Sequence, residues 1–99
     1  MSNIARELVG TDHDVGLCVI FVDAPPGRGP SLHRHPYEEI LIVTQGEATF
    51  FGEAGERLVR AGEVAIVPAG EPHGFTNSGD GPLKQIDIHA SPKFETEWL

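Results

Sequence analysis

Residues 27–46 read GRGPSLHRHPYEEILIVTQG, and three side chains in this stretch are spaced like ligands of one site: His33, His35 and Glu39. Alternate residues of an extended strand point to the same face, so His33 and His35 converge if they lie on a strand. Glu39 can rejoin them after a short turn. The stretch therefore predicts two strands that bring two imidazoles and one carboxylate together.

A second stretch, residues 62–77, reads GEVAIVPAGEPHGFTN and supplies a third imidazole, His73, after a turn rich in Gly and Pro. Three neutral imidazoles and one carboxylate suit a divalent transition metal and leave coordination positions open for another ligand. Fe, Mn, Ni, Zn, Co and Cu all accept this donor set. We therefore expect one divalent transition metal ion as cofactor, with its identity open.

Together the two stretches read G-x5-H-x-H-x3-E-x6-G and G-x5-P-x-G-x2-H-x3-N. They resemble the two signature motifs of the cupin superfamily and match them at all ten fixed positions. The resemblance implies an all-β double-stranded β-helix, or jelly-roll barrel, as a single domain over residues 1–99. It also implies His33, His35, Glu39 and His73 as the metal ligands, because the family spacing favours Glu39 over the preceding glutamate.

Short apolar segments separated by Gly and Pro independently predict an all-β chain, since turn residues at regular spacing are typical of sandwiches and barrels. We expect strands at residues 16–23, 31–34, 39–44, 47–51, 57–59, 64–67, 74–77 and 83–89. The tail differs from the rest of the chain. Ser91 can N-cap a short C-terminal helix that carries Phe94 and Trp98 on one face.

Two of the expected strands are apolar at every position. Residues 17–22 (LCVIFV) and 40–43 (ILIV) lack the alternation of a strand with one wet face. If Glu39 points inward, Ile40 and Ile42 point outward and need a cover, either from other strands or from another subunit. We therefore expect a homodimer.

Composition narrows the class of partner. Seven Lys and Arg against 15 Asp and Glu give a formal net charge of −8, which argues against binding nucleic acid or anionic membrane surfaces. The sequence contains no apolar run long enough to span a membrane and no apparent signal peptide. One cysteine, Cys18, excludes an internal disulfide. We expect a cytoplasmic protein that binds a small-molecule substrate or ligand.

The last expected strand carries two further polar side chains. In residues 86–90 (IDIHA), Ile86 and Ile88 share one face, and Asp87 and His89 share the other. If that polar face lines the barrel, Asp87 and His89 are candidate catalytic acid–base groups. If the strand lies at an edge, they form its solvated face. The sequence leaves both alternatives open.

Three classes of function fit these residues. The first is a metal-dependent enzyme of the dioxygenase, isomerase or decarboxylase type, acting on a small oxygenated molecule. The second is a non-catalytic cupin that binds a small ligand or a metal. The third is an assembly subunit with a structural metal, which an open coordination position argues against. We favour the enzyme, although a fold hosts many chemistries.

Overall fold

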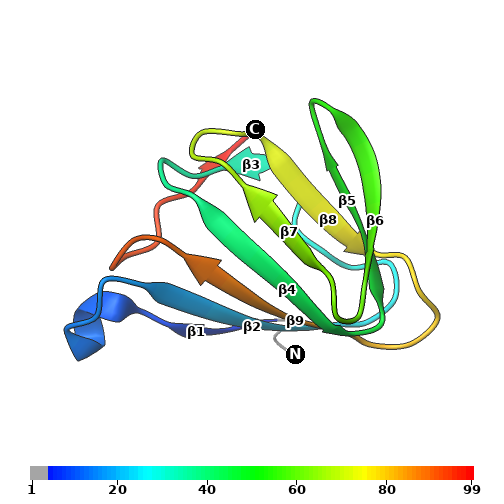
Figure 1. The fold of residues 1–99 in the computed structure, drawn as a ribbon, viewed down its shortest axis with the longest axis horizontal. Coiled ribbons are helices and arrows are strands. Elements are labelled where there is room, and N and C mark those ends of the chain that lie inside the picture. The colour runs from blue at the N-terminus through cyan, green and yellow to red at the C-terminus, as the bar shows by residue number, and fades with distance from the viewer. Residues whose placement is uncertain (1–4) are drawn as a thin grey trace.

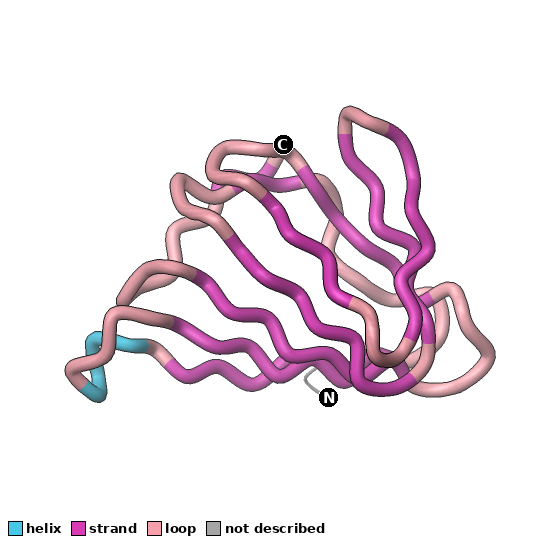
Figure 2. Tube along the Cα trace, viewed as in Figure 1, coloured by secondary structure: helices cyan, strands magenta, loops and turns pink. Residues whose placement is uncertain are grey.

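The computed structural model describes residues 5–99 and shows two antiparallel sheets that face each other (Figures 1 and 2). The elements in chain order are β1 (Ala5–Leu8), the 3-10 helix η1 (Gly10–His13), β2 (Cys18–Ala24), β3 (His33–Arg34), β4 (Glu39–Gln45), β5 (Glu47–Gly52), β6 (Gly55–Arg60), β7 (Val64–Val67), β8 (His73–Asn77), β9 (Leu83–His89) and β10 (Glu97–Trp98). The expected all-β jelly roll is confirmed.

The chain crosses repeatedly from one sheet to the other. The first sheet has the strand order β1-β2-β9-β4-β7, and the second has the order β10-β3-β8-β5-β6. In Figure 1 the strands of the first sheet run side by side across the lower left, and the β5–β6 hairpin rises on the right. Because of these crossings, β3 and β8 of the second sheet come to face β4 and β9 of the first.

All eight strands expected from the sequence are present, and their bounds differ from the expected ones by at most two residues. The structure adds β1 and β10, which the sequence did not indicate. Strand β9 lies between β2 and β4 in the middle of the first sheet. The interpretation of Asp87 and His89 as the solvated face of an edge strand is therefore wrong.

The expected C-terminal helix is also wrong. Ser91 does not cap a helix: its hydroxyl donates to the Lys93 carbonyl (2.8 Å) and accepts from the Lys93 N–H (3.3 Å) within one turn. The chain then pairs as β10 with the short strand β3, with Trp98 opposite His33. Pairing with an open strand edge gives the tail backbone hydrogen bonds that one isolated helical turn would not retain. Within residues 5–99 no helix has the length and apolar character needed to cross a membrane.

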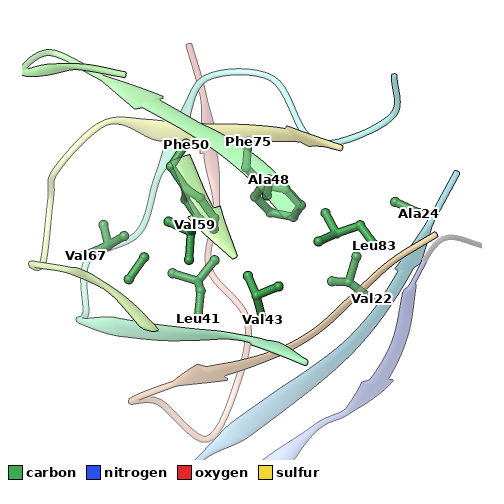
Figure 3. Packing of buried hydrophobic residues seen from close by; sticks show 11 residues of the cluster. Val22, Ala24, Leu41, Val43, Ala48, Phe50, Val59, Val67, Phe75 and Leu83 are labelled. Atoms are coloured by element: carbon green, nitrogen blue, oxygen red, sulfur yellow. The ribbon is translucent and has the colours of Figure 1, made fainter. Parts of the chain in front are cut away.

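The hydrophobic core lies between the sheets (Figure 3). Leu41 and Val43 of β4 point inward with 0% and 1% of their surface exposed, as alternation from an inward Glu39 requires. From the opposite sheet, the stacked rings of Phe50 and Phe75 meet them, with centroids 5.2 Å apart. The cluster consists of Val22, Ala24, Leu41, Val43, Ala48, Phe50, Val59, Ala65, Val67, Phe75 and Leu83.

One motif glycine makes the crossing between the sheets possible. Gly46 lies between β4 and β5 with φ +82°, a conformation that residues with a Cβ rarely adopt. A Cβ built there would lie 2.4 Å from the Pro82 carbonyl oxygen, which is a severe clash. Only glycine lets the chain turn this tightly against its neighbour.

The outer face of the first sheet is apolar across four strands. Its two rows, set by the strand register, are Val19–Ile88–Ile40–Ile66 and Phe21–Ile86–Ile42–Val64. We call these eight residues the apolar face. Ile66 is 70% exposed and Ile40 is exposed as well, whereas Ile42 is half-buried. The outward direction expected for Ile40 and Ile42 is confirmed.

Candidate metal centre

Five polar side chains meet at one end of the barrel, between the two sheets. His33 on β3 pairs with His73 on β8 in the second sheet. Glu39 on β4 pairs with His89 on β9 in the first sheet. His35 follows β3 in the connection to β4, and all five side chains are buried. Two cross-strand pairs on facing sheets therefore converge on one point.

The carboxylate of Glu39 lies at the centre of this group. Its Oε1 is 3.1 Å from Nε2 of His73 and 3.3 Å from Nε2 of His35, and its Oε2 is 3.1 Å from Nε2 of His89. His33, His35 and His73 can offer one ligand atom each within 4.8 Å of one another, and so can His35, Glu39 and His89. This His/Glu cluster is able to hold a metal ion.

Three of the imidazoles have their Nδ1 atoms against backbone carbonyls. A carbonyl oxygen only accepts, so each Nδ1 carries a proton, and in the neutral ring each Nε2 keeps a lone pair directed into the cluster. Metal-binding histidines in proteins usually have this orientation, in which the second ring N–H donates to a protein group. The acceptors are the carbonyls of Ser31 for His33 (2.7 Å), Glu95 for His35 (2.8 Å) and Glu71 for His73 (3.0 Å).

A loop glycine fixes the position of one of these rings. Gly70 has φ +79° in the turn before β8, and its N–H donates to the carbonyl of His35 at 2.7 Å. The turn that carries His73 is thereby tied to the segment that carries His35. The Gly and Pro positions of the second motif thus act on ligand geometry as well as on the turn itself.

The cluster favours a positive charge beside Glu39. Burial raises the pKa of Glu39, but contacts with His35, His73 and His89 outweigh burial and hold the pKa well below its usual range. Burial lowers the pKa of His33, which favours the neutral ring. Burial also acts to lower the pKa of His73, yet the Glu39 carboxylate raises it above its ordinary value. A proton or a metal ion would supply the charge that this carboxylate attracts.

A second observation, a buried nitrogen without a partner, also supports a metal ion at this cluster. Nε2 of His35 is buried and has no hydrogen-bond partner among residues 5–99. A buried polar atom without a partner costs about 1–3 kcal/mol, and such atoms call for an explanation. A divalent ion held by His33, His35, Glu39 and His73 would use this lone pair.

A cavity of about 230 Å³ opens onto the cluster. Phe94 and Trp98 of the tail stand at its rim, with ring centroids 5.0 Å from His89 and 4.9 Å from His33 respectively. Ile20, Val22 and Phe75 add apolar wall. Among residues 5–99, no Lys or Arg lines this cavity.

Asp87 also faces the cavity, one step deeper than His89 along β9. It is 3% exposed, and its Oδ1 accepts a hydrogen bond from Nε2 of the buried Gln85 at 2.8 Å. Burial, and then the charge of Glu39, raises the pKa of Asp87 well above its ordinary value, while Gln85 opposes the shift. Asp87 therefore favours a protonated carboxyl that can donate a hydrogen bond or a proton into the cavity.

The structure brings together all six residues singled out from the sequence, and it adds two that sequence reasoning missed. Gln85 shares a strand face with Asp87 and His89, so alternation along β9 could have found it. Tyr37 contacts Nδ1 of His89 at 2.7 Å from a loop 52 residues away. No local sequence pattern indicates this contact between Tyr37 and His89.

A family model described as a cupin domain matches residues 20–89, more than half of the chain. The chain belongs to the cupin family. The match begins within β2 and ends with β9, so it includes all four predicted ligands and His89.

Two curated relatives resemble this cupin. The oxalate-binding protein of Thermotoga maritima is 34% identical over 65 residues, which cover 65% of this chain and 54% of that protein. Endoribonuclease YbeY of Myxococcus xanthus is 35% identical over 74 residues, which cover 75% of this chain and 25% of that protein. The chain thus spans between a quarter and about half of the length of these relatives.

Solved structures agree on the architecture. A Klebsiella pneumoniae protein with a double-stranded β-helix domain has a TM-score of 0.77 at 28% identity and covers 83% of this chain and 69% of its own. Bacillus subtilis oxalate decarboxylase, which has Mn(II) centres, has a TM-score of 0.85 at 25% identity over 100% of this chain and 29% of its own. An oxalate oxidase bound to glycolate has a TM-score of 0.82 at 26% identity, and the match covers 95% of this chain and 53% of that one.

Proposed function

We propose that this cupin is a metal-dependent enzyme, of the dioxygenase, isomerase or decarboxylase type, that acts on a small oxygenated molecule. The observation that carries this proposal is the pairing of two unlike groups in one cavity. A cluster of imidazoles around the ionised Glu39 lies beside Asp87, a buried carboxyl that favours its protonated form. Groups whose environments push their pKa values apart are typical of sites that move protons.

His33, His35, Glu39 and His73 would hold the metal ion. A divalent ion there would supply Lewis acidity toward a carbonyl or enolate oxygen of the substrate. Mn(II) is the first candidate, because the similar oxalate decarboxylase has Mn(II) centres. Fe, Ni, Zn, Co and Cu suit the same donors and remain to be compared with it.

The charges around the cavity restrict the substrate. Glu39 leaves a divalent ion with about one net positive charge, and no Lys or Arg among residues 5–99 lines the cavity to add to it. A neutral or singly charged molecule is therefore favoured over a dianion. The cavity of about 230 Å³ lies below the roughly 300–1,000 Å³ usual for drug-sized ligands, which favours a molecule of few heavy atoms.

Asp87 would hold a proton at its carboxyl and donate it, or a hydrogen bond, to the substrate. Gln85 fixes the direction of this group by donating to Oδ1, which leaves the other oxygen of Asp87 for the cavity. Phe94 and Trp98 at the rim would limit the access of water. These side chains supply orientation, a proton and exclusion of solvent.

A non-catalytic binding protein is the second candidate. The similarity to an oxalate-binding protein of Thermotoga maritima supports it. The two functions differ in what Asp87 does, because a binding protein needs a hydrogen-bond donor there but no proton transfer.

Loading the protein with Mn(II) and measuring turnover separates the two functions. We expect stoichiometric metal and turnover of a neutral or monoanionic probe, drawn from acetylacetone, catechol, glycolate and pyruvate, followed by oxygen uptake and product NMR. Asp87→Asn should abolish that turnover and keep the metal. Calorimetric binding of glycolate without turnover of any probe would favour the binding protein, and binding of the dianion oxalate would in addition contradict the charge argument. Absence of bound metal under these conditions would contradict the enzyme and leave only a binding protein that takes its ligand without a metal.

We propose in addition that the apolar face binds a second copy of the chain. Its two rows contain no acidic side chain, whereas the chain carries a net charge of −8. Two like-charged copies repel least where their charges are absent. An uncharged apolar patch is also complementary to itself, as a two-fold symmetric interface requires.

A further inference from the structure

His89 differs from the other three imidazoles in the group that its Nδ1 contacts. Instead of a carbonyl, Nδ1 faces the Tyr37 hydroxyl at 2.7 Å. A hydroxyl can donate or accept, so its remaining neighbours decide the direction of the bond. The Glu95 N–H donates to this hydroxyl oxygen at 3.4 Å. Nδ1 of His35, also 3.4 Å away, already donates to the Glu95 carbonyl.

These contacts leave one acceptor for the hydroxyl proton among the described residues. Nδ1 of His89 accepts it, and the neutral ring of His89 then carries its own proton on Nε2. That tautomer is opposite to the one at His33, His35 and His73. An Nε2 that carries a proton has no lone pair for a metal ion, so His89 is a donor to its surroundings and not a ligand.

The partner of this N–H is the carboxylate of Glu39. Nε2 of His89 is buried 3.1 Å from Oε2 of Glu39, without a well-aligned hydrogen bond in the present orientation. The terminal torsion of a glutamate is broad, so a small rotation of the carboxylate aligns the two atoms. Oε1 meanwhile faces Nε2 of His35 and His73. The two oxygens of Glu39 thus have different partners.

We propose that Tyr37 and His89 act as a positioning pair that holds Oε2 of Glu39, so that Oε1 alone is presented to the metal ion. The inference rests on the proposed metal site and deepens it. A carboxylate that binds through one oxygen occupies one coordination position instead of two. The position kept open is available to a second oxygen of the substrate.

Metal affinity and coordination test this pair without any substrate. The parent protein, loaded with Mn(II), should show three histidine nitrogens on the metal by pulsed electron paramagnetic resonance. His89→Ala should keep these three nitrogens but lower the Mn(II) affinity by about 10- to 100-fold, as loss of a hydrogen-bond partner of a ligand does. His89→Gln, which supplies an amide N–H but no imidazole, should restore part of the affinity.

Tyr37→Phe removes one oxygen and keeps the ring, so it provides a test even where His89→Ala fails to fold. It should lower the Mn(II) affinity in the same direction, and adding it to His89→Ala should change little further, because the two residues act as one unit. Thr49→Val is the matched hydroxyl control. It removes a hydroxyl on β5 that donates to Ser78 at 2.9 Å, outside the cavity lining, and should leave the affinity within about twofold.

Two results would overturn the pair. Four histidine nitrogens in the parent and three in His89→Ala, with no rescue by His89→Gln, would make His89 a ligand. Unchanged Mn(II) affinity in folded His89→Ala and Tyr37→Phe would leave the pair without a positioning role. A parent protein that binds no metal would instead remove the proposed function, before any variant is compared.

Discussion

The two faces of strand β9 depart from the usual arrangement in opposite ways. An antiparallel sheet commonly packs apolar residues on the core and exposes polar residues to water. On β9 the buried residues after Leu83 are Gln85, Asp87 and His89, whereas Ile86 and Ile88 lie on the outer side. From Gln85 onward the strand carries polar groups inside and apolar groups outside.

Each departure costs free energy unless something else offsets it. Burying a polar group without a hydrogen bond costs about 1–3 kcal/mol, and Oε1 of Gln85 and the Nε2 atoms of His35 and His89 are such groups. Exposing an apolar face forfeits about 25 cal/mol for each Å² left in water. A metal ion would offset the first cost at His35, and a second subunit would offset the second cost along the apolar face.

Removing one ligand should give the largest effect on the inner face. His35→Ala deletes the imidazole whose Nε2 is buried without a partner. The metal affinity of the variant should therefore fall by more than the roughly 100-fold expected for a residue that only hydrogen-bonds to a ligand. Metal analysis of protein purified without added metal measures this loss, and circular dichroism checks the fold. Glu38→Gln, next to Glu39 but exposed, is the control and should keep its metal. Stoichiometric metal in His35→Ala would remove this residue from the shell.

The convergence of His33, His35 and Glu39 could be read from the sequence because it depends on local geometry, whereas His73 was placed with them by the resemblance to the cupin motifs. Alternation places His33 and His35 on one face, and a short connection returns Glu39 to it. The same rule gave the inward Leu41 and Val43 and the outward isoleucines. Where one strand face is buried, the period of two fixes which side chains point inward.

Long-range pairing could not be read in this way. Tyr37 meets His89 across 52 residues, and the tail forms β10 because β3 has an open edge beside it. Ser91 carries the signal of a helix start, yet strand pairing overrides that weak local preference. The pattern of β9 left its place in the sheet undecided, since a polar alternate face fits both an edge strand and a cavity wall.

On the outer face, a charge should break the proposed dimer. Ile66 is 70% exposed and lies at one end of its row, so Ile66→Glu places a carboxylate in the interface with little effect on the monomer. We expect the free energy of dimerisation to weaken by about 2–4 kcal/mol, which corresponds to a rise in the dimer Kd of about 30- to 1,000-fold. Light scattering should show the parent at about twice 10.7 kDa and the variant at 10.7 kDa.

Leu58→Glu is the matched control for this test. Leu58 is 40% exposed on β6 of the second sheet, outside the apolar face, and its substitution should leave the dimer intact. A parent protein that scatters as a monomer at micromolar concentration would contradict the interface. Equal dissociation in both variants would place the contact elsewhere.

The smallest effect should be a gain in stability on the inner face. The pKa of Asp87 is raised in the folded protein by burial and by Glu39. An unfolded aspartate ionises near pH 4, so stability falls as the pH rises from there through the folded pKa and stays lower above it. Asp87→Asn is close in size and does not ionise, so the variant should melt at a higher temperature than the parent near pH 8. The difference should shrink toward about pH 4. Thermal unfolding at the two pH values measures this difference, with EDTA present so that metal release does not contribute.

Asp23→Asn, on the exposed side of β2, is the control and should change the melting temperature little at either pH. A lower melting temperature for Asp87→Asn near pH 8, by a margin that shrinks toward about pH 4, would mean that the ionised carboxylate stabilises the fold. Asp87 would then have no proton to donate to the cavity, whereas a more stable variant that has lost turnover would show that this inward polar group is retained for chemistry.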